Sequence, residues 1–281
     1  MRPLHNYFEL AGMRMHYVDA GPAAARETVV MLHGNPSWSY YYRSLTKGLH
    51  DRCRVIVPDH LGMGLSDKPQ KALMLQDHID NLKALLDHLE LRDITLVVHD
   101  WGGPIGFGYA LARLEKVKRI VVMNSAAFFD PALPWRIKIC RGPVLGPFAV
   151  RRLNLFARAA TVMTTVRRLP KEVRQQYLRP YDSYENRAGI YGFLRDIPME
   201  AEHPTRQTFS QIEAGLSVIR DAQIPILILW GAADFCFTQH FLDRWKSYFP
   251  QATTVVYEGA GHYLLEDVPT EALTEIKEFM S

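Results

Sequence analysis

Short apolar runs alternate with stretches of helical character along most of the chain. Residues 13–18 alternate polar and apolar positions, which indicates a strand with one buried face. Short apolar runs that end in turn residues predict further strands over 28–32, 54–57, 94–98, 119–123, 225–230 and 253–257. Apolar residues at helical spacing predict helices over 75–89, 240–249 and 270–280, and the Gly/Ala-rich range 102–114 is interpreted as another.

Strands that alternate with helices predict an α/β fold with a mostly parallel central sheet, because parallel neighbours are joined by right-handed crossovers. In such a sheet the ligand lies at the carboxyl ends of the strands. Four polar residues, His33, Asp59, Asp100 and Asn124, each follow a predicted strand. We therefore expect these side chains to lie along one edge of the sheet.

The alternation stops between residues 128 and 209, where helical patches, Pro and Gly breaks and aromatic residues occur without a strand-like run. A strand-free segment between two strands of one sheet is most simply an inserted helical cap over the carboxyl edge. Such a cap excludes water and shapes a pocket. We therefore predict a core of residues 1–127 and 210–281 and a helical cap of residues 128–209.

The composition excludes several classes of protein. The chain has 281 residues, of which 48% are hydrophobic, and a formal net charge of +3, which is too small to indicate nucleic acid binding. No window of 18 apolar residues predicts a membrane span, and residues 1–7 lack a signal-peptide core. Cys53, Cys140 and Cys236 are scattered and odd in number, which predicts no disulfide framework or metal site and suits the cytoplasm. We expect no metal and no organic cofactor.

The strand–turn–helix around residue 100 carries the candidate nucleophile. Residues 97–103 read Val-Val-His-Asp-Trp-Gly-Gly, in the setting of the nucleophile elbow of α/β-hydrolases. The elbow usually carries serine, and here the position holds Asp100. A carboxylate is suited to displacement at saturated carbon, which forms an alkyl ester that water can later cleave. The alternative is that Asp100 only caps the helix that follows.

Two further residues complete a candidate triad. Asp234 and His262 each follow a predicted strand, and nucleophile, acid, histidine is the chain order of an α/β-hydrolase. His262 would take a proton from the water that attacks the ester, and Asp234 would hold the imidazole in the correct tautomer. Taken singly, His262 could be a surface loop residue and Asp234 a turn residue. All three at strand ends favour the triad.

Asn35 and Trp101 are the candidate donors of hydrogen bonds to developing negative charge. Their backbone N–H groups are placed to stabilise an oxyanion on the Asp100 ester. Their side-chain N–H groups can point at a leaving group, where displacement at saturated carbon builds negative charge. The alternatives are an Asx turn before Pro36 for Asn35 and packing against the cap for Trp101.

Together these motifs resemble the haloalkane dehalogenase family of α/β-hydrolases. The resemblance rests on His-Gly-Asn-Pro at 33–36, His-Asp-Trp-Gly-Gly at 99–103, Asp234 and Gly-His at 261–262, and it covers nearly the whole chain outside the cap. It implies an Asp–His–Asp triad with an Asn plus Trp leaving-group pair. One branch of the family has its triad acid where this chain has Asn124, so the resemblance implies Asp234 as the acid.

The ranges 56–69, 180–187, 195–198 and 240–243 resemble the β-lactone decarboxylases of bacterial long-chain olefin biosynthesis, which belong to the same superfamily. This resemblance implies loss of CO₂ from a cis-3,4-dialkyl β-lactone (an oxetan-2-one) to give a cis-alkene. We rank this reaction first, then haloalkane dehalogenation, then epoxide hydrolysis, for which four cap tyrosines are candidate acids. They are Tyr177, Tyr181, Tyr184 and Tyr191. A non-catalytic binding protein of hydrolase fold is a further alternative.

The cap also carries an unusual distribution of charge. Residues 131–170 contain eight Lys or Arg and no Asp or Glu, with Leu153, Leu155 and Phe156 interleaved. A basic segment with apolar interleaving indicates association with an anionic membrane or an acidic partner such as a pathway enzyme. The alternative is a solvated cap face. The sequence leaves the oligomeric state open.

Overall fold

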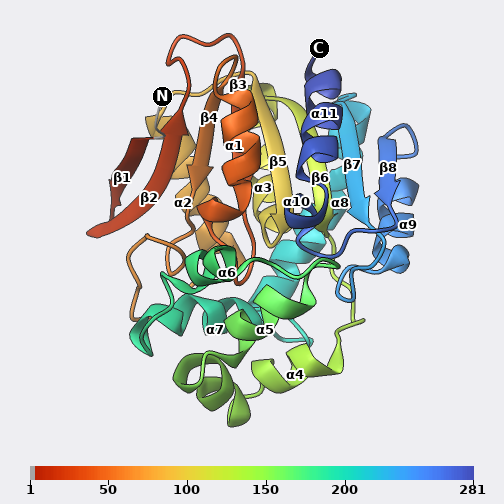
Figure 1. Ribbon diagram of the computed structural model, residues 1–281. Coiled ribbons are helices and arrows are strands. Elements are labelled where there is room, and N and C mark those ends of the chain that lie inside the picture. Colours follow the sequence, from red (N-terminus) through yellow and green to blue (C-terminus); the bar gives the residue numbers. More distant parts are fainter. Residues whose placement is uncertain (1–3) are drawn as a thin grey trace.

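A computed structural model describes residues 4–281, and these contain an eight-stranded sheet in the order β1-β2-β4-β3-β5-β6-β7-β8 (Figure 1). Its strands are β1 (Leu4–Leu10), β2 (Met13–Ala20), β3 (Thr28–Leu32), β4 (Arg54–Pro58), β5 (Ile94–Asp100), β6 (Val117–Ser125), β7 (Ile226–Gly231) and β8 (Thr253–Tyr257). The pairs β1–β2 and β2–β4 are antiparallel and the other pairs are parallel. The predicted α/β fold with a mostly parallel sheet is therefore confirmed.

Strand β1 is the one strand of the described sheet that the hydrophobic pattern did not predict. It pairs only with β2, at the edge of the sheet, and none of its residues from His5 to Leu10 is fully buried. An edge strand of this kind has no apolar run to identify it. Residues 1–3, which belong to the stretch inspected for a signal peptide, lie outside the described residues.

Helices cover both faces of the sheet (Figure 1). One face carries α1 (Arg43–Leu49) and α11 (Pro269–Met280), which pack against each other. The opposite face carries α2 (Leu75–His88), α3 (Gly102–Ala112), α8 (Pro204–Asp221) and α9 (Gln239–Tyr248). All five residues of β3 and all six of β7 are buried between these layers. Each buried Val, Leu or Ile side chain contributes roughly 1.5–3 kcal/mol relative to an exposed one.

Between β6 and β7 the described chain contains helices and no strand, as the sequence predicts. The helical elements before α8 are α4 (Trp135–Arg141), the π-helical turn η3 (Pro147–Arg152), α5 (Leu155–Met163), α6 (Lys171–Leu178), the 3₁₀ turn η4 (Glu185–Arg187) and α7 (Ala188–Arg195). They lie beyond the carboxyl edge of the sheet, at the end of the molecule away from the C-terminal end of α11 (Figure 1). The predicted boundary at 209/210 falls inside α8, which packs on α2 and α3, so this helix belongs to the core layer.

The remaining helical elements are η1 (Ser39–Tyr42), η2 (Leu114–Lys116) and α10 (Leu264–Asp267). No helix within residues 4–281 is long and apolar enough to cross a bilayer.

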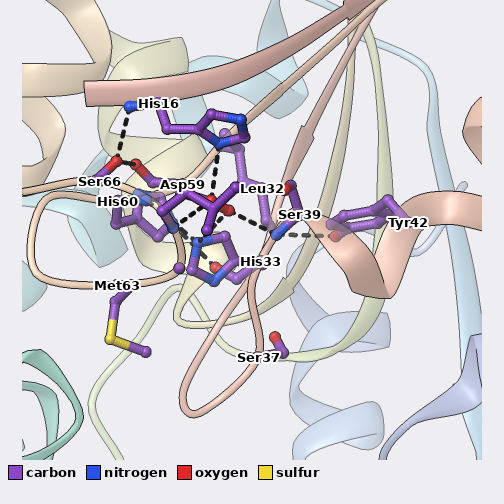
Figure 2. Close-up of polar contacts among 12 residues, drawn as sticks. His16, Leu32, His33, Ser37, Ser39, Tyr42, Asp59, His60, Met63 and Ser66 are labelled. Atoms are coloured by element: carbon purple, nitrogen blue, oxygen red, sulfur yellow. Dashed lines mark hydrogen bonds and ion pairs between the residues drawn. The ribbon is translucent and has the colours of Figure 1, made fainter. Parts of the chain in front are cut away.

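A buried polar cluster around Asp59 fixes the loop after β3 (Figure 2). The Asp59 carboxylate accepts hydrogen bonds from the backbone N–H groups of Ser39 (2.6 Å) and Leu65 (2.8 Å) and contacts His16 Nδ1 at 2.8 Å. Burial alone would raise the pKa of Asp59, but the hydrogen bond and charge of His16 outweigh burial and hold the pKa below its usual value. The cluster thereby ties β2 and the loop after β4 to residues 33–39.

The turn from β5 into α3 is tightly packed. Asp100 has φ +50°, a left-handed conformation that Asp tolerates better than most residues. Directly after it, a Cβ on Gly102 would lie 2.0 Å from the Leu32 carbonyl oxygen, which belongs to the backbone of β3. Only glycine therefore lets α3 begin this close to the sheet.

We predict that Gly102→Ala lowers the free energy of unfolding by about 1–3 kcal/mol, because the new methyl group meets backbone that cannot rotate away. Gly192→Ala in α7 is the matched control, since a Cβ there has no neighbour within 4 Å. The control should be neutral or slightly stabilising, by up to about 1 kcal/mol. Urea unfolding of the two variants measures the difference, and equal stability would contradict the packing argument.

Candidate active site

The carboxylate of Asp100 lies in a pocket of backbone N–H groups at the carboxyl end of β5. The Asn35 N–H donates to Asp100 Oδ1 over 2.6 Å, and the Trp101 N–H donates to the same carboxylate. Gly34 makes this approach possible, because a Cβ there would lie 2.0 Å from Oδ1. One oxygen of Asp100 thus occupies the position of an oxyanion, while Oδ2 faces His262. This is the donor arrangement expected for these two backbone groups.

His262 and Asp234 follow the two strands at the far end of the sheet, β8 and β7. The His262 Nδ1 atom lies 2.7 Å from Asp234 Oδ2, a hydrogen bond, and its Nε2 atom lies 4.0 Å from Asp100 Oδ2. All three side chains are at most 14% exposed. The structure therefore brings the predicted triad together, with the imidazole between the two carboxylates.

Asn124, which the resemblance excluded as the acid, has a supporting position. Its amide Nδ2 donates to Asp234 Oδ2 at 3.0 Å and to the Gly231 carbonyl at 3.0 Å, and its Oδ1 accepts from the Gly231 N–H. The Cys236 N–H donates to the other Asp234 oxygen at 2.7 Å. Asp234 thus enters the triad with both carboxylate oxygens hydrogen-bonded, which fixes the orientation of the carboxylate.

The loop that carries His262 is held by residues that sequence reasoning missed. His99 Nε2 lies 2.8 Å from the His262 carbonyl oxygen, and burial lowers the pKa of His99 well below 6.5, so this ring is neutral and Nε2–H donates. Asp267 accepts from the Gly261 N–H and from the N–H groups of Val166 and Arg167. The histidine loop is therefore also anchored to the part of the cap between α5 and α6. No sequence motif predicts these contacts, because they join segments that are far apart in the chain.

The pKa values of His262 and Asp100 are both raised. Burial would lower the pKa of His262, but the charge and hydrogen bond of Asp234 and the charge of Asp100 outweigh burial, so its pKa is raised above 6.5. Burial raises the pKa of Asp100 above 3.8, against the stabilising effects of His262 and of the Asn35 and Trp101 N–H groups. A carboxylate with a raised pKa is also a stronger base and nucleophile.

The side chains of Asn35 and Trp101 both reach the cavity in front of Asp100. The Asn35 amide uses one N–H for the Ile190 carbonyl of α7, at 3.1 Å, which leaves its second N–H available. The Trp101 ring packs against Phe193 and Phe209, and the residue lines both lobes of the cavity in front of Asp100. Both groups can therefore donate to a bound ligand.

The cavity in front of Asp100 has two lobes. Both are lined by Asp100 and the side chains around it, which are Trp101, Ile137, Ile197 and Cys236. One lobe runs toward the core helices α8 and α9 and is lined by Phe128, Phe129, Leu133, Phe209 and Phe241. The other runs under α5 and is lined by Leu155, Phe156, Ala159, Ala160 and Met163. The cavity thus forks at Asp100.

The cap tyrosines considered as acids for epoxide opening line neither lobe. The hydroxyls of Tyr177, Tyr181 and Tyr191 donate instead to Glu266, the Ser37 carbonyl and the Gly142 carbonyl. Tyr184 lies on the surface beneath the Arg151 guanidinium. The structure therefore places no tyrosine of this set at the reacting centre, and the epoxide hydrolase alternative loses its support.

Known proteins resemble this chain over nearly its whole length. The α/β hydrolase fold family matches residues 27–269. A cis-3-alkyl-4-alkyloxetan-2-one decarboxylase of Shewanella oneidensis is 44% identical over 96% of this chain and 86% of its own length. One of Xanthomonas campestris pv. campestris is 43% identical over 96% and 93%. Haloalkane dehalogenase 2 of Mycobacterium tuberculosis is 28% identical over 97% and 93%.

Among solved structures, haloalkane dehalogenase DatA from Agrobacterium tumefaciens C58 superposes with a TM-score of 0.88. The superposition covers 99% of this chain and 96% of that chain at 23% identity, so it shows the shared fold. The family match and the relatives at 43–44% identity give the same assignment. The chain belongs to the α/β-hydrolase fold family, among the haloalkane dehalogenase-like enzymes.

Proposed function

We propose that this chain converts cis-3-alkyl-4-alkyloxetan-2-ones into cis-alkenes and CO₂, with Asp100 as nucleophile. The observation that carries the proposal is the fork of the cavity at Asp100. A cis-3,4-dialkyl β-lactone has two alkyl arms on adjacent ring carbons, and each lobe accepts one arm while the ring lies against the nucleophile. A simple haloalkane has one chain and fills one lobe. The printed names of the relatives at 43–44% identity support the same substrate class.

The first step is displacement at ring carbon C4. Asp100 Oδ1 is held by the Asn35 N–H, so Oδ2 is the attacking oxygen. A bond forms between Oδ2 and C4, and the bond from C4 to the ring oxygen breaks. The ring oxygen leaves as a carboxylate that remains attached to C3. The free N–H of the Asn35 amide and the Trp101 indole N–H donate to this new negative charge.

The second step releases both products without water. The bond from C3 to the carboxylate breaks and CO₂ departs. Its electron pair forms the C3–C4 double bond, and the bond between C4 and Asp100 breaks, which restores the carboxylate. Displacement inverts C4, so departure of the two groups from opposite faces returns the cis arrangement of the arms. No proton or oxidant is consumed, and the apolar lobes exclude the water that would hydrolyse the ester.

Haloalkane dehalogenation is the second candidate, and the position of His262 favours it. Hydrolysis of an alkyl ester on Asp100 needs a base beside the ester, and His262 Nε2 faces Asp100 Oδ2 at 4.0 Å. The decarboxylation has no step that needs this base. We therefore propose that a haloalkane is turned over as a side activity, with the halide held by the side chains of Asn35 and Trp101.

We also propose a cytoplasmic location. Cys53, Cys140 and Cys236 are all unpaired thiols, which supports a reducing compartment.

The proposed reaction is tested by supplying purified protein with a cis-3,4-dialkyl β-lactone and, separately, with a 1-iodoalkane. Gas chromatography of alkene and electrode measurement of halide give the two rates, and alkene formation should dominate. Asp100→Asn should reduce both rates by about 10³-fold or more. The exposed Asp243→Asn is the control for loss of a carboxylate. Rapid halide release with an inert lactone would make the protein a dehalogenase.

Labelled water separates the two fates of the Asp100 ester. During haloalkane turnover in water enriched in oxygen-18, water attacks the ester carbonyl, so the label should accumulate in the Asp100 carboxylate. During lactone turnover C–O cleavage returns the original oxygen, and Asp100 should stay unlabelled. Mass spectrometry of the peptide that contains residue 100 measures the label. Equal labelling with both substrates would show that alkene formation passes through ester hydrolysis.

The pH dependence of the two reactions should also differ. The pKa of His262 is raised above 6.5, so as the pH falls through it the imidazole gains a proton and stops acting as a base. Protonation of Asp100, whose pKa burial raises above 3.8, would remove the attacking carboxylate from both reactions alike, so the loss of the base is what separates the two profiles. Dehalogenation should therefore decline with a midpoint above 6.5, while alkene formation persists to lower pH. Initial rates across the range test this, and coincident profiles would assign the base to both reactions.

A further inference from the structure

Most of the exposed large apolar side chains belong to one segment of the cap. Fourteen large hydrophobic side chains are exposed in the described part of the chain, and ten of them lie between residues 135 and 166. These ten, here called the cap surface, are Trp135, Ile139, Val144, Leu145, Phe148, Leu153, Leu155, Val162, Met163 and Val166. Such a concentration marks an interaction site more often than chance exposure does. Val144 is the most exposed, at 81%, and Leu145 and Phe148 beside it are 61% and 58% exposed.

Exposed basic side chains belong to the same segment as the cap surface. Residues 131–170 contain no Asp or Glu, and six of their eight basic side chains are exposed without an ion pair among the described residues. The six are Arg136, which lies over the Trp135 ring, and Lys138, Arg152, Arg158, Arg167 and Arg168. Of the other two, Arg141 is buried and pairs with Glu200, and Arg151 is half-buried and lies over the Tyr184 ring. Apolar side chains among unopposed cations fit a surface that is both apolar and anionic.

The same helices separate the cap surface from the two-lobed cavity. In α4, Trp135 and Ile139 are exposed while Ile137 and Cys140 line the cavity. In α5, Leu155 and Met163 are partly exposed and also line the cavity, so the lobe under α5 reaches the outside there. A ligand that arrives at the cap surface is therefore one helix thickness from Asp100.

We propose that the cap surface docks onto anionic phospholipid bilayers. The exposed apolar side chains enter the boundary between headgroups and acyl chains, and the six free cations contact lipid phosphates. We commit to a bilayer as the partner, because the cations are interspersed with exposed apolar residues and residues 131–170 carry no acid that lipid phosphates would repel. This surface is at the end of the molecule opposite the C-terminal end of α11 (Figure 1).

The test is co-sedimentation of the full chain with vesicles in the absence of substrate, which makes the result independent of the proposed reaction. Vesicles contain phosphatidylcholine alone or with about one third phosphatidylglycerol. The protein should bind only the anionic vesicles at about 0.05 M salt and should be released at about 0.5 M, where charges are screened within a few ångströms. Failure to bind anionic vesicles at low salt would overturn the proposal.

Two variants test the two components of the surface. Arg152→Glu with Arg158→Glu should weaken binding about tenfold or more, because each reversal replaces attraction by repulsion. Arg92→Glu with Lys246→Glu changes the net charge equally on exposed positions outside the cap and should leave binding unchanged. Leu145→Ser with Phe148→Ser should weaken binding at unchanged charge. None of these six residues lines the cavity, so activity on a short-chain lactone monitors folding.

Two outcomes would contradict lipid docking even if the protein sediments. Equal loss in both charge-reversal variants would assign binding to net charge rather than to the cap surface. A dimer in size-exclusion chromatography that Leu145→Ser with Phe148→Ser dissociates would assign the cap surface to contact between two copies of this chain.

Discussion

The structure is arranged around the carboxylate of Asp100, which is buried in surroundings that disfavour its charged form. Burial raises the pKa of Asp100. Three groups oppose this effect by stabilising the charged carboxylate, namely the ring of His262 and the backbone N–H groups of Asn35 and Trp101. Each comes from a different segment, after β3, β5 and β8. The parallel sheet is what brings those segments to one edge, and glycine at positions 34 and 102 is what lets them approach closely enough. The chemistry therefore depends on backbone geometry as much as on the triad side chains.

Around this centre, each functional side chain has a second residue that fixes its direction. Asn124 and the Cys236 N–H orient Asp234, and His99 holds the His262 backbone. The Asp59 cluster likewise fixes the loop that contains Asn35 (Figure 2). These supports are buried and hydrogen-bonded, so the reacting groups lose little additional freedom when a ligand binds. A site preorganised in this way suits stabilisation of charge by fixed dipoles.

The sequence was most informative about strands and about the polar residues that follow them. Seven strands were predicted from apolar runs, and Asp100, Asp234 and His262 were selected because each is a reactive residue type at the end of a strand. Strand β1 was not predicted because none of its residues from His5 to Leu10 is fully buried, and the predicted boundary at 209/210 falls within the single helix α8. The support by His99 and Asn124, the fork of the cavity and the remote tyrosine hydroxyls depend on how distant segments pack, and a linear pattern does not record that.

The fork of the cavity affects how the alkene product is released. Once CO₂ has left, the alkene has no polar atom, so the donors at Asn35 and Trp101 no longer retain it, while both arms remain in apolar lobes. Transfer of hydrocarbon into water costs about 0.8 kcal/mol per methylene, so ten methylenes cost about 8 kcal/mol and slow escape into water by roughly 10⁵ to 10⁶. The opening at Leu155 and Met163 is thus an exit as well as an entrance. The turnover rate of long-chain substrates would therefore be limited by release of the alkene, which depends on whether it enters water or an apolar phase, rather than by the bond-breaking steps.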